Sequence, residues 1–477
     1  MPIRATRRRF ASARAAGLVA CLVACLVAFG AIAAAQGVRA QDAPAVVARQ
    51  PGDPAPTAAL GLRPAARDPL VFAPVRAEVR VPVTRLAPSP PAPAAAPRAA
   101  PDEDPYAPLG IRAGALTLRP SLTQSLGWDS NPARVEAGAK GRALSRTEGV
   151  VTLESDWSRH ALTGSARGTW DAYRGGDPEP RLSGGADVGL RLDIARDTAL
   201  TLGASAATAT ERTRSPELPG DLADGPRTST LAASAALDTR FNRLALGLRG
   251  GIARTLNDDA TRLDGTRLDR SGDDVTETSA ALRVGYEISP RLVPFVEAEI
   301  DRRRYDEAGT DRDSIGRTGR VGAAVEITRR LAGEVSAGWQ VRTYDDAARR
   351  EVDGTVAEAR LVWTPTPLTT VTLAGESRLA ETTVAGARAA EARRASLAVS
   401  HAVRRNVILD AALTLARTDY PGSTLSEELL TASAGAEWRL NRSVALTGRY
   451  THERLASTAP GADFVADVAL VGLRLTR

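Results

Sequence analysis

Few side chains in this sequence could perform acid–base chemistry near neutral pH, because the 477 residues include only three histidines. His452 alone stands close to both a carboxylate and a hydroxyl, in Glu453 and Ser457. A hydrolase would need such a trio at one rim of its fold, with the imidazole between the nucleophile and the acid. His160 and His401 fall in a short turn and at a strand end. We expect all three to be solvated side chains, and we expect no enzyme.

Cofactor and metal motifs are equally sparse. No glycine-rich stretch has the frame of a phosphate-binding loop, and no histidine and acid cluster has metal-ligand spacing. The acidic stretches 257–259 and 269–274 offer oxygen ligands of the kind calcium takes, although solvated loops commonly have the same composition. The sequence therefore predicts no cofactor.

Charged residues instead recur at every second position of many segments, opposite an apolar set. Mixed charges on one wet face pair across strands and also shape permeation if that face lines a channel. The pore-lining candidates are Arg167, Asp187, Arg191, Arg283, Glu287, Glu297, Glu299, Asp301, Arg342, Glu376, Arg378, Glu437, Arg439 and Arg449.

The elements that carry these residues have the period of β-strands. From Leu116 onward, apolar and polar residues alternate over roughly ten residues, stop at a turn and start again. We predict strands near 116–128, 147–157, 161–173, 182–193, 199–211, 228–238, 244–256, 276–288, 292–305, 317–327, 331–344, 355–363, 369–379, 392–401, 407–420, 429–440, 444–452 and 464–475.

The connections between these segments alternate in length. Short turns such as 289–291 and 328–330 follow the even-numbered segments, and longer polar loops such as 129–146 and 257–275 follow the odd-numbered ones. Outer-membrane barrels have turns at the periplasm and loops outside, and a membrane offers no partner for an open sheet edge. The sequence predicts an all-β fold: a transmembrane antiparallel up-and-down barrel of about 18 strands (16 to 18), with both ends in the periplasm.

All six tryptophans share the parity of the apolar set and fall towards predicted strand ends. Trp157, Trp363 and Trp438 lie by short turns, and Trp128, Trp170 and Trp339 lie towards long loops. Two aromatic girdles at the membrane interfaces would explain this placement.

The N-terminus has the form of an export signal. Five arginines without an acid precede an apolar run from Ala15, which ends in the A-x-A sequence 33–35. We predict a signal peptide over 1–35, with cleavage after Ala35 or Ala40. Cys21 and Cys25 each end a lipobox-like sequence, but the apolar residues that follow favour ordinary cleavage.

Removal of this segment leaves the mature chain without cysteine and lowers its formal charge from +6 to +1. The sequence therefore predicts neither nucleic-acid binding nor disulfides. Residues 36–110 are rich in proline and alanine, which favour extended solvated backbone, so we predict a disordered periplasmic linker before a barrel over 111–477.

The start of the predicted barrel carries a family resemblance. Asp104-Pro105-Tyr106, the stretch 108–112, Leu118-Arg119-Pro120-Ser121-Leu122 and Gly127-Trp128-Asp129-Ser130-Asn131-Pro132 resemble the opening of the outer-membrane family named putative β-barrel porin 2. The resemblance implies an outer-membrane location in a Gram-negative bacterium, and a link of some relatives to exopolysaccharide production or export. It supplies no catalytic residues.

These observations favour an aqueous pore for passive or gated passage of small solutes, because barrels of this size usually enclose water. Two alternatives stay open: an outer-membrane component of exopolysaccharide export or biosynthesis, and a structural barrel whose own side chains block the lumen. The expected partners are outer-membrane lipid, the barrel assembly machinery and periplasmic or polysaccharide-export proteins. The assembly machinery would read Leu473 and Leu475, since the chain ends without an aromatic residue.

Overall fold

Residues with alternating apolar and polar character form long antiparallel strands in the computed structural model. It describes residues 105–477 except 176–177, 212–214, 220–221, 224, 307–311, 347–350 and 385. The signal peptide predicted over 1–35 and most of the linker predicted over 36–110 lie outside the described residues. In the part of the chain that is described, no helix is both long and apolar enough to cross a membrane.

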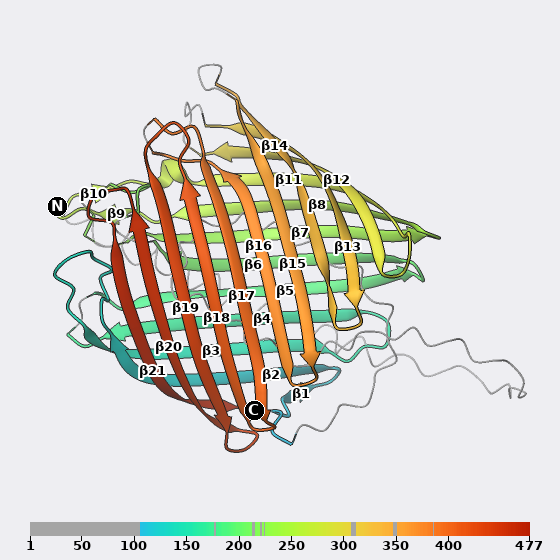
Figure 1. The fold of residues 1–477 in the computed structure, drawn as a ribbon, viewed down its shortest axis with the longest axis horizontal. Helices are drawn as coiled ribbons and strands as arrows, with labels where there is room; N and C mark the ends of the chain where they lie inside the picture. The colour runs from blue at the N-terminus through green and yellow to red at the C-terminus, as the bar shows by residue number, and fades with distance from the viewer. Residues whose placement is uncertain are drawn as a thin grey trace, which may run out of the picture.

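Eighteen long strands form one closed sheet in which each pairs with its neighbours in sequence (Figure 1). The last strand pairs with the first long one, from Ser121 opposite Thr476 to Asp129 opposite Val468, and this pairing closes the barrel. The long strands are β2 (Leu116–Asp129), β3 (Arg142–Ser155), β4 (Ala161–Tyr173), β5 (Arg181–Ala195), β6 (Thr198–Thr210), β7 (Arg227–Phe241), β8 (Leu244–Asn257), β11 (Val275–Tyr286), β12 (Leu292–Tyr305), β13 (Ser314–Thr328), β14 (Leu331–Tyr344), β15 (Val352–Thr366), β16 (Thr369–Ala380), β17 (Ala390–Arg404), β18 (Val407–Asp419), β19 (Ser426–Arg439), β20 (Val444–Ser457) and β21 (Phe464–Thr476).

The predicted fold class and strand number are therefore confirmed. The period-two pattern succeeds because successive side chains of a strand point to opposite faces of the sheet. On β12, Val296 and Ile300 are half-exposed on the outer face, whereas Glu297 and Asp301 are buried on the inner face. An apolar outer face and a charged inner face are the inverse of a soluble protein, and they suit a barrel in lipid.

Four short elements were not predicted from the sequence. The strand β1 (Ile111–Ala113) pairs with residues 116–118 of β2, beyond the end of β21. The connection between β8 and β11 contains the hairpin of β9 (Ala260–Thr261) and β10 (Arg267–Leu268) and the 3₁₀ turn η1 (Ser271–Asp273). These elements are too short to show a period in the sequence.

Short and long connections alternate around the barrel, as predicted. Two-residue turns such as Arg196–Asp197 and Arg329–Arg330 are at one end, together with the start of β2 and the end of β21. Connections such as 258–274 and 381–389 are at the other end. We call these the turn end and the loop end.

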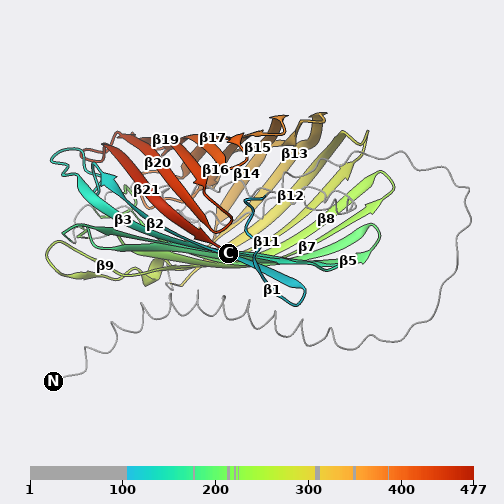
Figure 2. The ribbon, with the colours of Figure 1, turned by 90° about the horizontal axis from the view of Figure 1, so that it is seen from below.

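The wall from β14 to β21 crosses the wall from β2 to β8 at a steep angle, in orange-red against teal-green in Figure 1. Figure 2 shows these two walls on opposite sides of the interior. This arrangement brings side chains from distant strands towards one another across the lumen.

Five of the six tryptophans are about half-exposed on the outer face: Trp128, Trp170, Trp339, Trp363 and Trp438. Trp157 lies in the turn after β3 and is the exception. It packs against the buried side chains of Leu116, Leu153 and Leu162 at the turn end. Its position beside a short turn is as predicted, but it covers neighbouring leucines rather than standing free.

Candidate functional site

The interior face holds the charged side chains that could act on a solute. The structure places the fourteen candidate residues on the faces opposite the exposed apolar residues, with Glu287 one residue beyond the end of β11. Their role in lining a pore stays a prediction. Their contacts divide them into groups.

One group is a chain of buried ion pairs that links side chains on three strands, β8, β12 and β13. The Glu297 carboxylate on β12 accepts bonds from Arg249 on β8 and from Arg320 on β13, each at 3.0 Å. Arg320 also donates to Glu299 at 3.0 Å. The four side chains are between 6% and 14% exposed, so these bonds replace lost hydration and brace the wall.

Arg283 stands next to this group. Its guanidinium makes a bidentate contact with Glu334, at 2.9 and 2.7 Å, and lies 3.4 Å from the centre of the Phe295 ring. A guanidinium held by both a carboxylate and a ring has little freedom to follow a passing ion. We therefore regard it as part of the wall.

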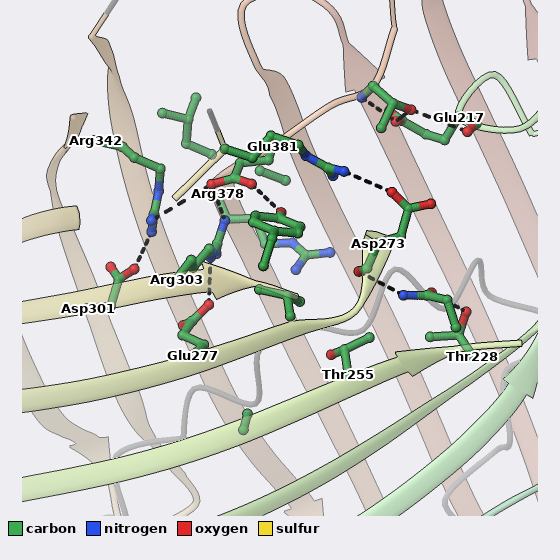
Figure 3. A pocket seen from close by; sticks show the side chains of 18 of the residues that line it. Glu217, Thr228, Thr255, Asp273, Glu277, Asp301, Arg303, Arg342, Arg378 and Glu381 are labelled. Carbon is green, nitrogen blue, oxygen red and sulfur yellow. Dashed lines mark hydrogen bonds and ion pairs between the residues drawn. The ribbon is translucent and has the colours of Figure 1, made fainter. Parts of the chain in front are cut away.

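The second group lies at the loop end and is centred on Glu381, just beyond β16 (Figure 3). Its carboxylate accepts hydrogen bonds from Tyr305 and, at 2.9 Å, from Ser314, and it lies 3.4 Å from Arg303. Arg303 also donates to Glu277 at 2.6 Å. One loop carboxylate thus joins β12, β13 and β16.

The candidates Asp301 and Arg342 form an ion pair at the edge of this network, and Glu376 and Arg378 lie 3.7 Å apart on β16. Burial alone would raise the pKa of the Glu381 carboxyl, but Arg303 and Arg342 hold that pKa below its usual value. The Glu381 carboxyl is therefore ionised at neutral pH.

These residues line a cavity of about 250 Å³ between the walls. Its lining reaches from Ala253 and Thr255 on β8 to Glu376 and Arg378 on β16, and includes loop residues. Among the lining residues of the described chain, eight carboxylates face five arginines, so a solute would meet an excess of negative charge. The carboxylates are Glu211, Glu217, Asp273, Glu277, Glu299, Asp301, Glu376 and Glu381, and the arginines are Arg270, Arg303, Arg312, Arg342 and Arg378.

Two loops meet above this cavity. The Glu217 carboxylate, in the connection between β6 and β7, accepts bonds from the Thr382 hydroxyl at 2.7 Å and from the Thr383 amide and hydroxyl at 2.7 and 2.6 Å. Thr382 and Thr383 follow β16, on the far side of the barrel opening from β6. The contact therefore narrows the loop end.

The third group lies near the pairing of β2 with β21, which we call the closing seam. Glu437 accepts a bond from Arg439 at 2.7 Å and also pairs with Arg474 on β21. Arg449 and Asp410 line a cavity of about 60 Å³ beside Glu437. The wall is therefore charged here as well.

The four remaining candidates lie nearer the turn end or on β4 and β5. Asp187 accepts a bond from Ser165 at 2.6 Å, Arg191 lies 2.8 Å from Asp193, and Glu287 lies 3.4 Å from Arg240. Arg167 is on the inner face of β4. None of these four borders the larger cavity.

Several residues of these networks were missing from the sequence-based candidates. Arg249, Glu277, Glu334 and Arg474 could have been found, because each has inward parity on a strand that was predicted. Glu381 could not have been found, because it lies in a loop, where the side chains follow no period-two pattern.

The fold separates the side chains of His452, Glu453 and Ser457, the residues considered above as a hydrolase triad. His452 points outwards and contacts Asp467 at 2.8 Å, whereas Glu453 points inwards and binds Arg134. Adjacent residues on a strand cannot share one face. This geometry does not assemble a His–acid–Ser triad from these residues.

A closed antiparallel barrel with an apolar outside and a charged inside is a membrane barrel of the porin type. The chain belongs to the family described as putative beta-barrel porin 2, whose model matches residues 104–477. The resemblance noted at residues 104–132 is thus confirmed across the whole barrel.

Solved structures with a similar fold are outer-membrane proteins of low sequence identity. A mutant of the ferric enterobactin receptor PfeA from Pseudomonas aeruginosa is 9% identical, with a TM-score of 0.40 over 77% of this chain and 81% of that one. The siderophore receptor PiuA from Acinetobacter baumannii is 10% identical, with a TM-score of 0.42 over 77% and 82%. The outer membrane protein opdK from Pseudomonas aeruginosa is 13% identical, with a TM-score of 0.37 over 76% and 99%. Comparison with curated protein sequences found no match.

Proposed function

We propose that this protein is an outer-membrane pore for small solutes, narrowed at its loop end, with no catalytic activity. The observation that carries the proposal is the continuous charged inner wall of a closed barrel, from Glu287 near the turns to Glu381 at the loops. Charged side chains facing a lumen favour water in it, whereas the apolar outer face favours lipid.

The contact between Glu217 and Thr382–Thr383 supports a constriction of the loop end that can open. It consists of hydrogen bonds between two loop segments whose contacting side chains are exposed or half-buried. Such contacts are weak in water, typically contributing about 1 kcal/mol each. Loops joined this way can separate when a solute arrives.

The test is conductance across a planar bilayer with the purified, refolded protein. We expect discrete steps in current, and we expect Glu217→Ala to increase the conductance of each step. The substitution removes the three bonds to the carboxylate and leaves only the bond from the Thr383 hydroxyl to the Glu217 carbonyl oxygen, at 3.2 Å. Glu179→Ala is the matched control, since Glu179 is an exposed carboxylate in the connection between β4 and β5. It should leave the steps unchanged.

Absence of current would contradict the proposal if the protein in the bilayer is folded, as judged by heat-modifiable mobility in gels. The structural barrel with a blocked lumen would then be the better reading. Steps of equal conductance from Glu217→Ala and the unmodified protein would support the pore but contradict the proposal that the loop contact narrows it.

A further inference from the structure

The turn end carries an arginine in seven of its eight short turns. One of them, Arg159, is held by the carbonyl oxygens of Asp193 and Ile194, at 3.3 and 3.2 Å. We call Arg196, Arg243, Arg291, Arg329, Arg405 and Arg442 the turn arginines; each comes from a different turn. All six are exposed, and no ion pair to a carboxylate is found for them among the described residues. Arg442 donates from Nε to the Pro105 carbonyl oxygen at 2.8 Å. They are spread around the edge of the barrel, and they differ in their pairing from the arginines of the interior groups, which form ion pairs with acids.

Each turn arginine follows an exposed apolar side chain by two or three residues. These apolar residues are Ile194, Phe241, Ile288, Ile327, Val403 and Leu440, between 44% and 60% exposed on the outer face. Exposed apolar side chains at a strand end mark the border of the hydrocarbon layer. A residue two positions further along a strand lies about 7 Å away, at the depth of lipid headgroups.

The loop end has the opposite charge. The connection between β8 and β11 contains six aspartates against three arginines. The aspartates are Asp258, Asp259, Asp264, Asp269, Asp273 and Asp274, and the arginines are Arg262, Arg267 and Arg270. The asymmetry means that the positive charge of the turns is not a general property of the surface. It is placed where one membrane leaflet meets the barrel.

We propose that the turn arginines bind the phosphates of anionic phospholipids in the leaflet around the turn end. A guanidinium offers paired donors that match phosphate oxygens, and an anionic surface contributes about 1 kcal/mol for each nearby basic residue. The proposal rests on the membrane insertion included in the proposed function, but not on conduction. It gives the barrel a preference for headgroup charge on one side.

The tryptophans of the barrel allow a direct test. In vesicles of phosphatidylcholine, bromine-labelled phosphatidylglycerol or bromine-labelled phosphatidylcholine quenches tryptophans beside the labelled lipid, and the two extents of quenching give a relative affinity. The refolded barrel with Trp128→Phe, Trp170→Phe and Trp339→Phe reports the turn end only. The converse variant, with Trp157→Phe, Trp363→Phe and Trp438→Phe, reports the loop end.

At the turn end we expect phosphatidylglycerol to be preferred about five-fold at low salt, the factor that corresponds to one such arginine contact. The preference should fall towards one at about 0.5 M NaCl, because salt screens exposed charges. The loop-end reporter should show no preference.

Arg329→Gln with Arg405→Gln should also lower the preference at the turn end, since these turns flank Trp363 and Trp438 through the pairs Leu331–Trp363 and Val407–Trp438. The matched control is Arg304→Gln with Arg317→Gln, two exposed arginines on the outer face towards the loop end, which should leave the preference intact.

Equal quenching by the two lipids at the turn end would overturn the proposal, and this result needs no substituted arginine. It would also be overturned if detergent-solubilised barrel bound soluble polyglutamate through the turn arginines while vesicles showed no lipid preference. The partner would then be an acidic polymer. Conductance measured with the same protein distinguishes these failures from failure of the pore.

Discussion

Arg134, in the connection between β2 and β3, joins Asp129 at the end of β2 to Glu453 on β20. Its Nη1 donates to Asp129 Oδ1 and its Nε donates to Glu453 Oε2, each at 2.8 Å. The three side chains are at most 4% exposed. Tyr173 on β4 donates a further bond to Asp129 at 3.0 Å. The guanidinium therefore holds the loop that follows β2 against the strands that close the barrel.

The residues of the family resemblance build this arrangement. Asn131 donates from its side chain to the carbonyl oxygens of Val135 and, on β21, Val465. Ser130 accepts a bond from the Asp467 amide at 2.8 Å. Arg134 itself has a backbone φ of 53°, a conformation uncommon for residues other than glycine. The segment from Trp128 to Pro132 thus stabilises the closing seam, where β2 pairs with β21.

We predict that Arg134→Gln destabilises the folded barrel by about 3 kcal/mol, because it leaves two buried carboxylates without their cation. The measurement is equilibrium unfolding by urea in lipid vesicles. Arg119→Gln is the control: its pair with Glu154, at 2.9 Å, is solvent-exposed, and its loss should cost less than about 1 kcal/mol. Equal effects of the two substitutions would contradict a special role for the seam.

The second prediction concerns the two faces of β13. Ala323 lies opposite Val335 on the outer face, and Ala324 lies opposite Glu334 on the inner face. An arginine near the bilayer midplane costs roughly 2 to 4 kcal/mol when it faces lipid, and little when it faces water. Ala323→Arg should therefore reduce the free energy of unfolding in vesicles much more than Ala324→Arg. The reverse order would mean that the inner and outer faces are assigned wrongly.

The third prediction follows from the lowered pKa of Glu381. Because folding lowers this pKa, the stabilisation is complete above the unfolded value, near 4.3, and is lost as the pH falls through the lower folded value. Glu381→Gln should destabilise the barrel by about 3 kcal/mol at pH 7, since it leaves Arg303 and Arg342 with one fewer carboxylate. Urea unfolding at a series of pH values should show the difference from the unmodified protein shrinking below about pH 4.

Glu376→Gln is the matched control for this substitution. Glu376 lines the same cavity, but its side chain is 48% exposed and lies 3.7 Å from Arg378. Its loss should cost less than about 1 kcal/mol at any pH. A pH-independent effect of Glu381→Gln would show that the carboxylate acts through packing rather than charge.

The fourth prediction tests the orientation. Gly265 lies between β9 and β10 at the loop end, and Arg329 lies in the turn between β13 and β14. On intact cells, Gly265→Cys should react with an impermeant maleimide and Arg329→Cys should not, because loops face outwards in such barrels. Both sites should react after the cells are broken. Equal reaction before lysis would contradict the orientation.

The sequence by itself determined the strands, their faces and the alternation of turns and loops. These properties are local: a strand repeats every two residues, and the surrounding lipid makes the outward set apolar along its whole length. Val321 and Arg320 could therefore be assigned to opposite faces from the printed letters alone.

Only the tertiary structure decided which inward charges meet. Glu297 binds arginines on β8 and β13, and Glu381 reaches across strands from a loop, because register and the crossing of the two walls set these contacts. Arg134 and Glu453 are 319 residues apart and meet only because β2 pairs with β21. Contacts of this kind depend on closure of the whole barrel, which no local period encodes.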